Sequence, residues 1–377
     1  MEFRTITSIS VLSENITIIS LSASLNQGHL CMEKENVSFC GVVGLVTRNV
    51  KISSEGSEDP SNRHWGFGGH IVNVDKVEEW YERTGKLSGV VYFLDVQFIN
   101  LGKVNSDHYA VSFMYEMEHQ PSHIESCFFQ DSYNFPLRIK GVENMIFKEN
   151  VMTGNIGGGV YVEPDCRNIQ ILGNVVIGVA QLPSVLASLY AWTRPVAGFT
   201  IESHDVIIKD NVCAGSVDQG FAIATKFFLT SSDNICRVRK GLEYIYDSSV
   251  VDHHGKFVNN EAVGRRVGLM VMAMRPDEVG PNGCSTVNGI LAWRIAHVGI
   301  QALNPETDTF VAGVVVAENH IGILLDVVQF RREATTGILQ ATVIGALADN
   351  GYSDLPDSNW DQRCHAFSWY LNSLIEH

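Results

Sequence analysis

The sequence repeats one short pattern at a nearly constant interval. An Asn-Val pair opens Asn150-Val-Met-Thr-Gly, Asn174-Val-Val-Ile-Gly and Asn211-Val-Cys-Ala-Gly, and Cys127-Phe-Phe-Gln-Asp holds the same place one repeat earlier. The first two intervals are 23 and 24 positions, and the third is 37, which is 24 plus an insertion of 13 within positions 181–197. A period in the low twenties with a sharp corner in each repeat is typical of a solenoid of stacked coils.

Each repeat contains apolar runs that are too short for helices. Runs such as Asn168-Ile-Gln-Ile-Leu-Gly and Asp205-Val-Ile-Ile-Lys-Asp place apolar side chains at every second position, as strands do. Three such strands and three corners need about 20–25 residues, which is one turn of a parallel β-helix. We therefore predict an all-β chain, a right-handed parallel β-helix with short decorating helices.

The alternative is that each Asn-Val pair marks a turn between ordinary antiparallel strands, because Asn is common in turns. The constant offset between the apolar run, the Asn and the following Gly favours the coil. In a coil, the stacked apolar side chains form the core, so we expect polar substitutions of Ile146, Ile171 or Ile207 to destabilise the fold.

Stacking also predicts a role for the asparagines. Equivalent positions of neighbouring coils lie about 4.8 Å apart, so an inward Asn can hydrogen-bond the next Asn and satisfy backbone groups at the corner. Cys127 would fill the same column as a buried free thiol. The interval of 49 from Asn211 to Asn260 suggests two coils, one of them degenerate. The predicted column contains Asn150, Asn174, Asn211, Asn260 and Asn319.

The predicted β-helix spans residues 1–350, with its first coils at about 1–100 and regular coils at about 101–350. A helical pattern at positions 75–86 suggests an outer decoration. Residues 351–377 are polar and then helical in pattern, which suggests a cap or tail at the open end of the stack.

Composition excludes several partners. The net charge is −15 and the sequence has no basic block, which argues against nucleic acid and anionic membrane surfaces. No run approaches 18 uninterrupted apolar residues, so no membrane span is expected. The first residues lack the apolar core of a signal peptide.

Two features nevertheless suggest an extracellular protein. The chain has eight cysteines and two glycosylation sequons, Asn15-Ile-Thr and Asn36-Val-Ser. These features and the lack of a signal peptide are both explained if the sequence is an internal piece of a longer secreted or membrane-anchored chain. Spacing allows two disulfides without assigning either, Cys31 with Cys40 and Cys236 with Cys284.

Candidate chemistry is sparse. His70 follows two glycines and could approach His108 across stacked coils, with Asp107 beside it, as an acid–base or metal site. The alternative, which we favour, is that both imidazoles hydrogen-bond backbone at corners. We predict no metal, no cofactor and no catalytic residue. Several acidic residues fall on neighbouring coils, but nothing in the sequence pairs them as a glycosidase requires: Asp107, Glu116, Glu118, Asp131 and Glu149.

Several stretches resemble the fibrocystin family. Gly44-Leu-Val-Thr-Arg-Asn-Val-Lys-Ile, followed by Gly66-Phe-Gly-Gly-His-Ile, is similar to the region after the eight-glycine domain of fibrocystin, fibrocystin-L and the hyaluronan-binding cell-migration protein. Gly158-Gly-Val-Tyr-Val-Glu, Asn211-Val-Cys-Ala-Gly-Ser and Cys284-Ser-Thr-Val-Asn-Gly-Ile-Leu-Ala-Trp continue the likeness. The similarity runs from about residue 5 to about residue 350.

The resemblance implies a parallel β-helix in the ectodomain of a large, single-span cell-surface protein. Fibrocystins are receptor-like proteins of cilia and related surface projections without established catalytic activity. The resemblance therefore implies a location on the extracellular side of the plasma or ciliary membrane, as part of a longer chain, or otherwise secretion. The implied function is a non-catalytic extracellular scaffold that binds a protein or glycan ligand and reaches the membrane only through other parts of a longer chain.

The sequence departs from the family in two respects. The eight-glycine domain and the membrane span are absent from this sequence. Where the hyaluronan-depolymerising branch carries a His-rich strand, this chain has Asp107-His108-Tyr-Ala-Val-Ser-Phe, with one His. The alternative function, binding or depolymerising hyaluronan, is weakened by that difference.

Overall fold

The computed structural model is built from β-strands, with no helix in the residues that it describes. The chain divides into two units, Met1–Gly44 and Leu45–His377. The described residues are 4–13, 16–26, 31–34, 37–40, 45–55, 66–80, 83–87, 89–104, 106–115, 121–180, 196–203, 205–223, 257–264, 266–272, 284–303, 308–326, 336–345 and 365–369.

The first unit contains two antiparallel hairpins. Strand β1 (Ile6–Ser13) pairs with β2 (Ile16–Leu21), and β3 (Cys31–Lys34) pairs with β4 (Val37–Cys40). The sequence predicted coils from the first residues onward, because these runs alternate like the strands of a coil. The connections are too short for a parallel crossover, which needs a dozen residues or more, so the strands pair as hairpins.

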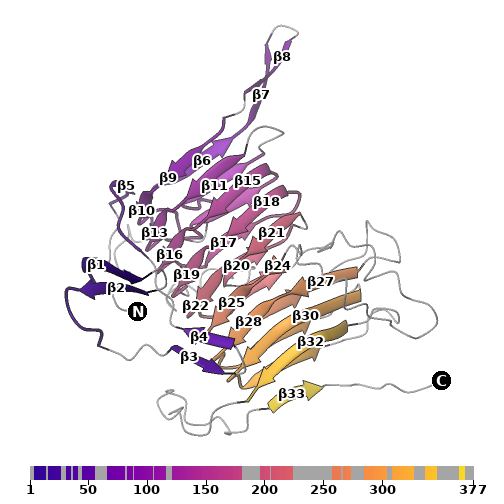
Figure 1. The fold of residues 1–377 in the computed structure, drawn as a ribbon. Coiled ribbons are helices and arrows are strands. Elements are labelled where there is room, and N and C mark those ends of the chain that lie inside the picture. Colours follow the sequence, from indigo (N-terminus) through magenta and orange to yellow (C-terminus); the bar gives the residue numbers. More distant parts are fainter. Residues whose placement is uncertain are drawn as a thin grey trace, which may run out of the picture. The chain divides into compact units, whose positions relative to one another are not determined.

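The second unit is dominated by three long parallel sheets, seen in Figure 1 as successive rows of arrows. The six-stranded sheet contains, in spatial order, β24 (Phe257–Val258), β21 (Val206–Lys209), β18 (Arg167–Leu172), β15 (Glu143–Lys148), β12 (Ser122–Glu125) and β9 (Tyr92–Leu94). The ten-stranded sheet contains β33 (His365–Trp369), β31 (Ile321–Asp326), β29 (Val298–Leu303), β26 (Val267–Met272), β23 (Gln219–Ile223), β20 (Ala197–Ile201), β17 (Gly158–Val162), β14 (Leu137–Lys140), β11 (Val111–Met114) and β6 (Ile71–Val74).

The eleven-stranded sheet completes each coil. Its order is β27 (Cys284–Asn288), β30 (Asp308–Ala317), β28 (Ile290–Trp293), β25 (Asn260–Val263), β22 (Val212–Ala214), β19 (Val175–Ile177), β16 (Val151–Thr153), β13 (Phe128–Gln130), β10 (Val96–Ile99) and β5 (Val50–Ser53), with β32 (Thr336–Ile344) paired to β30. In the regular coils the chain visits the six-, eleven- and ten-stranded sheets in turn, and each strand pairs in parallel with its counterpart in the next coil. The predicted parallel β-helix is confirmed.

Two predicted helices are strands. The segment at positions 75–86 forms an antiparallel hairpin of β7 (Lys76–Trp80) and β8 (Arg83–Leu87), because its two halves pair with each other across two residues. The pattern near the C-terminus contributes β33, which adds to the ten-stranded sheet beside β31. In both places strand pairing overrides a local helical pattern.

Corners in the left-handed backbone region explain the repeated motif. Residues with φ between 51° and 76° stand before and after the short strands of the eleven-stranded sheet. Glycine adopts this region without steric cost, and Asn and Asp adopt it more readily than other residues. The column before the strands is Asp95, Ser126, Glu149, Gly173, Asp210, Asn259 and Gly289, continued by Gly313 within β30, and the column after them is Asn100, Asp131, Gly154, Gly178, Gly215, Gly264, Arg294 and Glu318.

Four of the predicted asparagines form one buried ladder. Asn150 donates from both its backbone N–H (3.0 Å) and its Nδ2 (2.9 Å) to Oδ1 of Asn174. Asn174 donates in the same way to Asn211, and Asn211 to Asn260. The backbone N–H of Cys127 donates to Asn150 at 2.9 Å, and Cys127 is a buried free thiol. The ladder therefore satisfies the polar groups of each corner with those of its neighbour.

Two details of the predicted column are wrong. Asn211 hydrogen-bonds Asn260 directly, so the two residues lie in adjacent coils. The additional sequence positions between them fall between β23 and β24. Asn319 lies outside the ladder, since Ile290 is the register partner of Asn260 in the next coil. Asn319 instead accepts a hydrogen bond from the backbone N–H of Ile295 at the corner between the eleven- and ten-stranded sheets. Equal spacing does not reveal which corner of a coil an Asn occupies.

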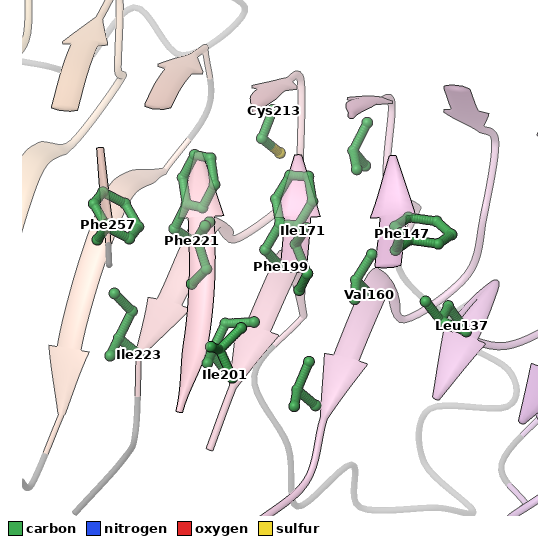
Figure 2. Close-up of a cluster of buried hydrophobic side chains, with 14 of the residues drawn as sticks. Leu137, Phe147, Val160, Ile171, Phe199, Ile201, Cys213, Phe221, Ile223 and Phe257 are labelled. Atoms are coloured by element: carbon green, nitrogen blue, oxygen red, sulfur yellow. The ribbon is translucent and has the colours of Figure 1, made fainter. Parts of the chain in front are cut away.

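The core is a set of side-chain columns between the sheets. Figure 2 shows part of it, with Phe199 and Phe221 stacked 4.9 Å apart between ring centroids. Ile171 is fully buried there, as predicted. Ile146 and Ile207 point outward, and Ile207 is 36% exposed. Their inward neighbours are Phe147, Val206 and Ile208, so the prediction placed the alternation of β15 and β21 one residue out of phase.

This alternation gives a paired stability prediction. Phe147 is fully buried, whereas Ile146 in the same strand is half-buried on the outer side. We expect Phe147→Ser to lower the free energy of unfolding by about 3–5 kcal/mol, because it removes a core aromatic and buries a hydroxyl. Ile146→Ser should cost under about 1 kcal/mol. Chemical denaturation followed by circular dichroism measures both, and equal costs would contradict the observed alternation.

A column of glycines brings the ten- and eleven-stranded sheets close together. The register of β17, β20, β23, β26, β29 and β31 aligns six glycines, one in each strand. A Cβ on Gly268 would lie 2.5 Å from the carbonyl oxygen of Gly299 and 3.0 Å from Cβ of Ala292. Real Cβ atoms do not approach other atoms to 2.5 Å. The 2.5 Å clash lies within the ten-stranded sheet and the 3.0 Å contact lies between the two sheets, so both spacings depend on a column without side chains. Its members are Gly159, Gly198, Gly220, Gly268, Gly299 and Gly322.

Candidate functional site

The outer side of the ten-stranded sheet carries a cluster of charged and aromatic side chains, here called the outer-face cluster: Arg138, Lys140, Tyr161, Glu163, Glu202, Tyr109, His70 and His108. Its members come from neighbouring coils, because Ser112, Arg138, Tyr161 and Thr200 are successive register partners. Inward residues of the same strands, such as Ile139 and Val162, belong to the core. Strand alternation thus directs the polar set away from the core.

An ion pair lies at the centre of this cluster. Arg138 Nη2 lies 2.5 Å from Oε1 of Glu163, and Arg138 Nε donates to the same oxygen at 2.6 Å. Both side chains are almost buried, at 6% and 10% exposure. Lys140 Nζ lies 3.7 Å from the other carboxylate oxygen, and Arg138 also covers the ring of Tyr109 at 4.8 Å. A buried pair of this kind costs desolvation, so it is stable only with such additional partners.

A second carboxylate stands one coil away. Glu163 and Glu202 directly follow Val162 and Ile201, which are register partners. Tyr161 donates its hydroxyl to Oε2 of Glu202 at 2.9 Å. Two carboxylates therefore occupy equivalent positions on neighbouring coils, whose strands lie about 4.8 Å apart.

The structure brings His70 and His108 together. Their ring centroids lie 5.1 Å apart in an edge-to-face arrangement. His70 Nε2 lies 3.3 Å from Oγ of Ser112, and His108 Nδ1 lies 3.3 Å from Oγ of Ser106. The sequence favoured hydrogen bonds from both imidazole rings to the backbone. The observed contacts join each ring to a serine hydroxyl instead. Asp107 is exposed.

Burial, with the neighbouring His108 and Arg138, lowers the pKa of His70 below 6.5. The unfolded chain then binds this proton at a higher pH than the folded chain does. The stability due to neutral His70 is full above its unfolded pKa and is lost as the pH falls from that value through the lower folded pKa. We expect His70→Gln to lose less stability than the parent between about pH 7.5 and about pH 5.5. Denaturation midpoints across this range test it, and equal losses would contradict the lowered pKa.

The other sequence candidates are dispersed or lie outside the described residues. Asp131 and Glu149 occupy left-handed corners of different columns. Glu116, Glu118, Asn15, Asn36 and Cys236 lie outside the described residues, so the Cys236–Cys284 pairing is not addressed by the structure. No group of three or more His, Cys, Asp or Glu residues in the described ranges could hold a metal ion. Within those ranges, no helix has the length and apolarity to cross a membrane.

Sequence reasoning missed Arg138, Glu163 and Glu202. Glu163 ends Gly158-Gly-Val-Tyr-Val-Glu, a segment noticed only for its resemblance to other proteins. The available signal was register: aligning this segment with Leu137-Arg-Ile-Lys and Ala197-Gly-Phe-Thr-Ile-Glu places the three charges on one face.

Long connections flank the ten-stranded sheet at both ends of its strands. More than ten residues separate β6 from β9, β23 from β24 and β26 from β27, and these connections leave the C-terminal ends of its strands. More than ten residues also precede the N-terminal ends of β6, β11 and β20. The corners from the six- to the eleven-stranded sheet contain one or two residues in the regular coils. Lys140 ends β14, and Glu163 and Glu202 directly follow β17 and β20, at the C-terminal ends of these strands. Variable connections beside polar side chains are typical of functional surfaces on rigid scaffolds.

Comparison with known proteins gives no relative for this chain: no protein-family model, no curated protein and no solved structure matches it.

Proposed function

We propose that this chain is a rigid, non-catalytic extracellular β-helix segment of a fibrocystin-like cell-surface receptor, acting as a scaffold and ligand-binding surface. The observation that carries the proposal is the continuous parallel pairing from β5 through β32, reinforced by the asparagine ladder. Such a stack holds outward side chains in fixed register over many coils. The outer-face cluster of the ten-stranded sheet is the surface on which a protein or glycan ligand would bind.

Surface labelling tests the location. We would express the full parent gene with an epitope tag and label intact and permeabilised cells. The proposal expects labelling of intact cells at the plasma or ciliary membrane, and a glycosidase-sensitive mobility shift that Asn15→Gln and Asn36→Gln reduce. Labelling confined to permeabilised cells, with no glycan on either Asn, would contradict an extracellular position.

A second candidate function is favoured by the two neighbouring carboxylates. Retaining glycosidases place two carboxyl groups about 5–5.5 Å apart, which is close to the spacing of adjacent coils. The outer-face cluster could therefore bind or cleave an extracellular glycan such as hyaluronan, with Glu163 and Glu202 flanking the bond. Its Arg138, tyrosines and histidines would bind hydroxyl and carboxylate groups of the sugar.

An assay with size-resolved hyaluronan separates the two functions. The scaffold proposal expects no shortening of the polymer by the parent. The glycosidase alternative expects shortening that Glu163→Gln and Glu202→Gln abolish and that His70→Ala reduces. Glu143→Gln, on the six-stranded sheet, is the matched control and should leave the result unchanged. Activity that survives both Gln substitutions would place any catalysis elsewhere.

A further inference from the structure

We propose that Cys31 and Cys40 form a disulfide that closes the β3–β4 hairpin. The two residues are direct Cα partners at the open end of this antiparallel pair. The sequence alone placed them nine positions apart, which left their pairing unassigned. The register supplies what spacing could not, because it puts the two backbones side by side.

The position within the hairpin suits a disulfide. Only two residues separate β3 from β4, and Lys34 is the Cα partner of Val37 beside that connection. In hairpins with two-residue connections the flanking pair is hydrogen-bonded, and hydrogen-bonded and non-hydrogen-bonded pairs then alternate along the ladder. Counting three pairs outward from Lys34 and Val37 places Cys31 and Cys40 at a non-hydrogen-bonded position.

Non-hydrogen-bonded partners have Cα atoms about 4.5 Å apart, the closer of the two spacings. Disulfides span Cα separations of about 4.4–6.8 Å, so this bond requires no movement of the strands. The three described thiols of the second unit are in a different situation. Cys127, Cys166 and Cys213 are buried, and burial raises their pKa to about 11, about 11 and about 12. They remain protonated near neutral pH and react slowly.

Formation of the bond is an exchange reaction with a small disulfide such as oxidised glutathione. The thiolate of one cysteine attacks the oxidant, releases one reduced thiol and forms a mixed disulfide. The thiolate of the second cysteine then displaces the other reduced thiol, which leaves the Cys31–Cys40 bond. The protein loses two electrons and two protons, and the oxidant becomes two molecules of thiol.

Peptide mapping of the full chain tests the proposal. We would equilibrate the folded protein in oxidised and reduced glutathione, block free thiols with an alkylating agent in denaturant, and digest without reduction. The expected result is one linked peptide pair containing Cys31 and Cys40, with Cys127, Cys166 and Cys213 alkylated. Cys31→Ser should leave Cys40 as an alkylated thiol, and Cys40→Ser should do the same for Cys31. Cys364→Ser is the control and should keep the link.

Two outcomes overturn the proposal. In one, Cys31 and Cys40 are both alkylated under excess oxidant although circular dichroism shows the folded chain. In the other, either cysteine is linked mainly to a third cysteine. Neither result bears on the hyaluronan assay, so the disulfide and the function are tested separately.

Discussion

Gly268→Ala is expected to be among the most damaging single-methyl changes in the chain. The new Cβ would lie 2.5 Å from the backbone carbonyl oxygen of Gly299, and a carbonyl held in a parallel ladder cannot rotate aside. Relief requires β26 and β29 to separate within the ten-stranded sheet, and Ala292 and Ala262, at 3.0 Å and 3.4 Å from the same Cβ, limit a shift toward the eleven-stranded sheet. We expect a loss of about 3 kcal/mol or more in the free energy of unfolding, at the upper end for overpacked cores.

Gly345→Ala is the matched control for this substitution. A Cβ at Gly345 meets no atom within 4 Å, and its φ lies outside the left-handed region. Replacing a glycine of this kind is neutral or stabilises by about 0.4–1 kcal/mol through the unfolded state. Denaturant titrations of the two variants give the comparison. Similar denaturation midpoints for Gly268→Ala and the parent would show that the methyl group is accommodated, which would contradict the close packing at the glycine column.

Asn174→Leu is expected to cost about 3–5 kcal/mol, because it leaves several buried groups without partners. Oδ1 of Asn174 accepts two hydrogen bonds from Asn150, and its Nδ2 donates to the carbonyl of Phe147 at 2.9 Å and to Asn211. Leucine has a similar volume but can replace none of these bonds. Asn150, Asn174 and Asn211 are fully buried, so bulk solvent cannot replace the lost hydrogen bonds.

Gln170→Ala removes an amide from the outer side of the neighbouring strand and serves as the control. Surface changes of this kind usually stay within about 0.5 kcal/mol. Hydrogen exchange adds a local readout, because the backbone N–H of Asn150 donates to the ladder. We expect that proton to exchange much faster in Asn174→Leu. Unchanged protection there, with unchanged stability, would mean that the ladder contributes little.

The architecture was predictable because one physical requirement recurs at a fixed interval. Left-handed corners select Gly, Asn and Asp, so Gly154, Gly178 and Gly215 appear at the same offset from their asparagines. Other features of the fold could not be predicted from the repeat. The glycine column was missed because sequence spacing does not show which glycines face a sheet and which form corners.

The outer-face cluster was less predictable for the same reason. Arg138 and Glu163 are 25 positions apart, and only the register between β14 and β17 makes them neighbours. Phase errors had the same origin: Ile146 and Ile207 sit in runs of consecutive apolar residues, where alternation alone does not select the buried set. The hairpin register of Cys31 and Cys40 likewise depends on strand pairing that spacing leaves open.

The asparagine ladder ends at Ile290, and this has a mechanical consequence. Between Cys127 and Asn260, asparagine side chains link neighbouring coils in addition to the backbone pairing. Beyond Asn260 that additional link is missing at the same corner. Because each coil contacts only its neighbours, a pulling force along the stack should separate this joint more readily than the joints that the ladder spans. The coils linked by the asparagines should stay paired under a force that separates it.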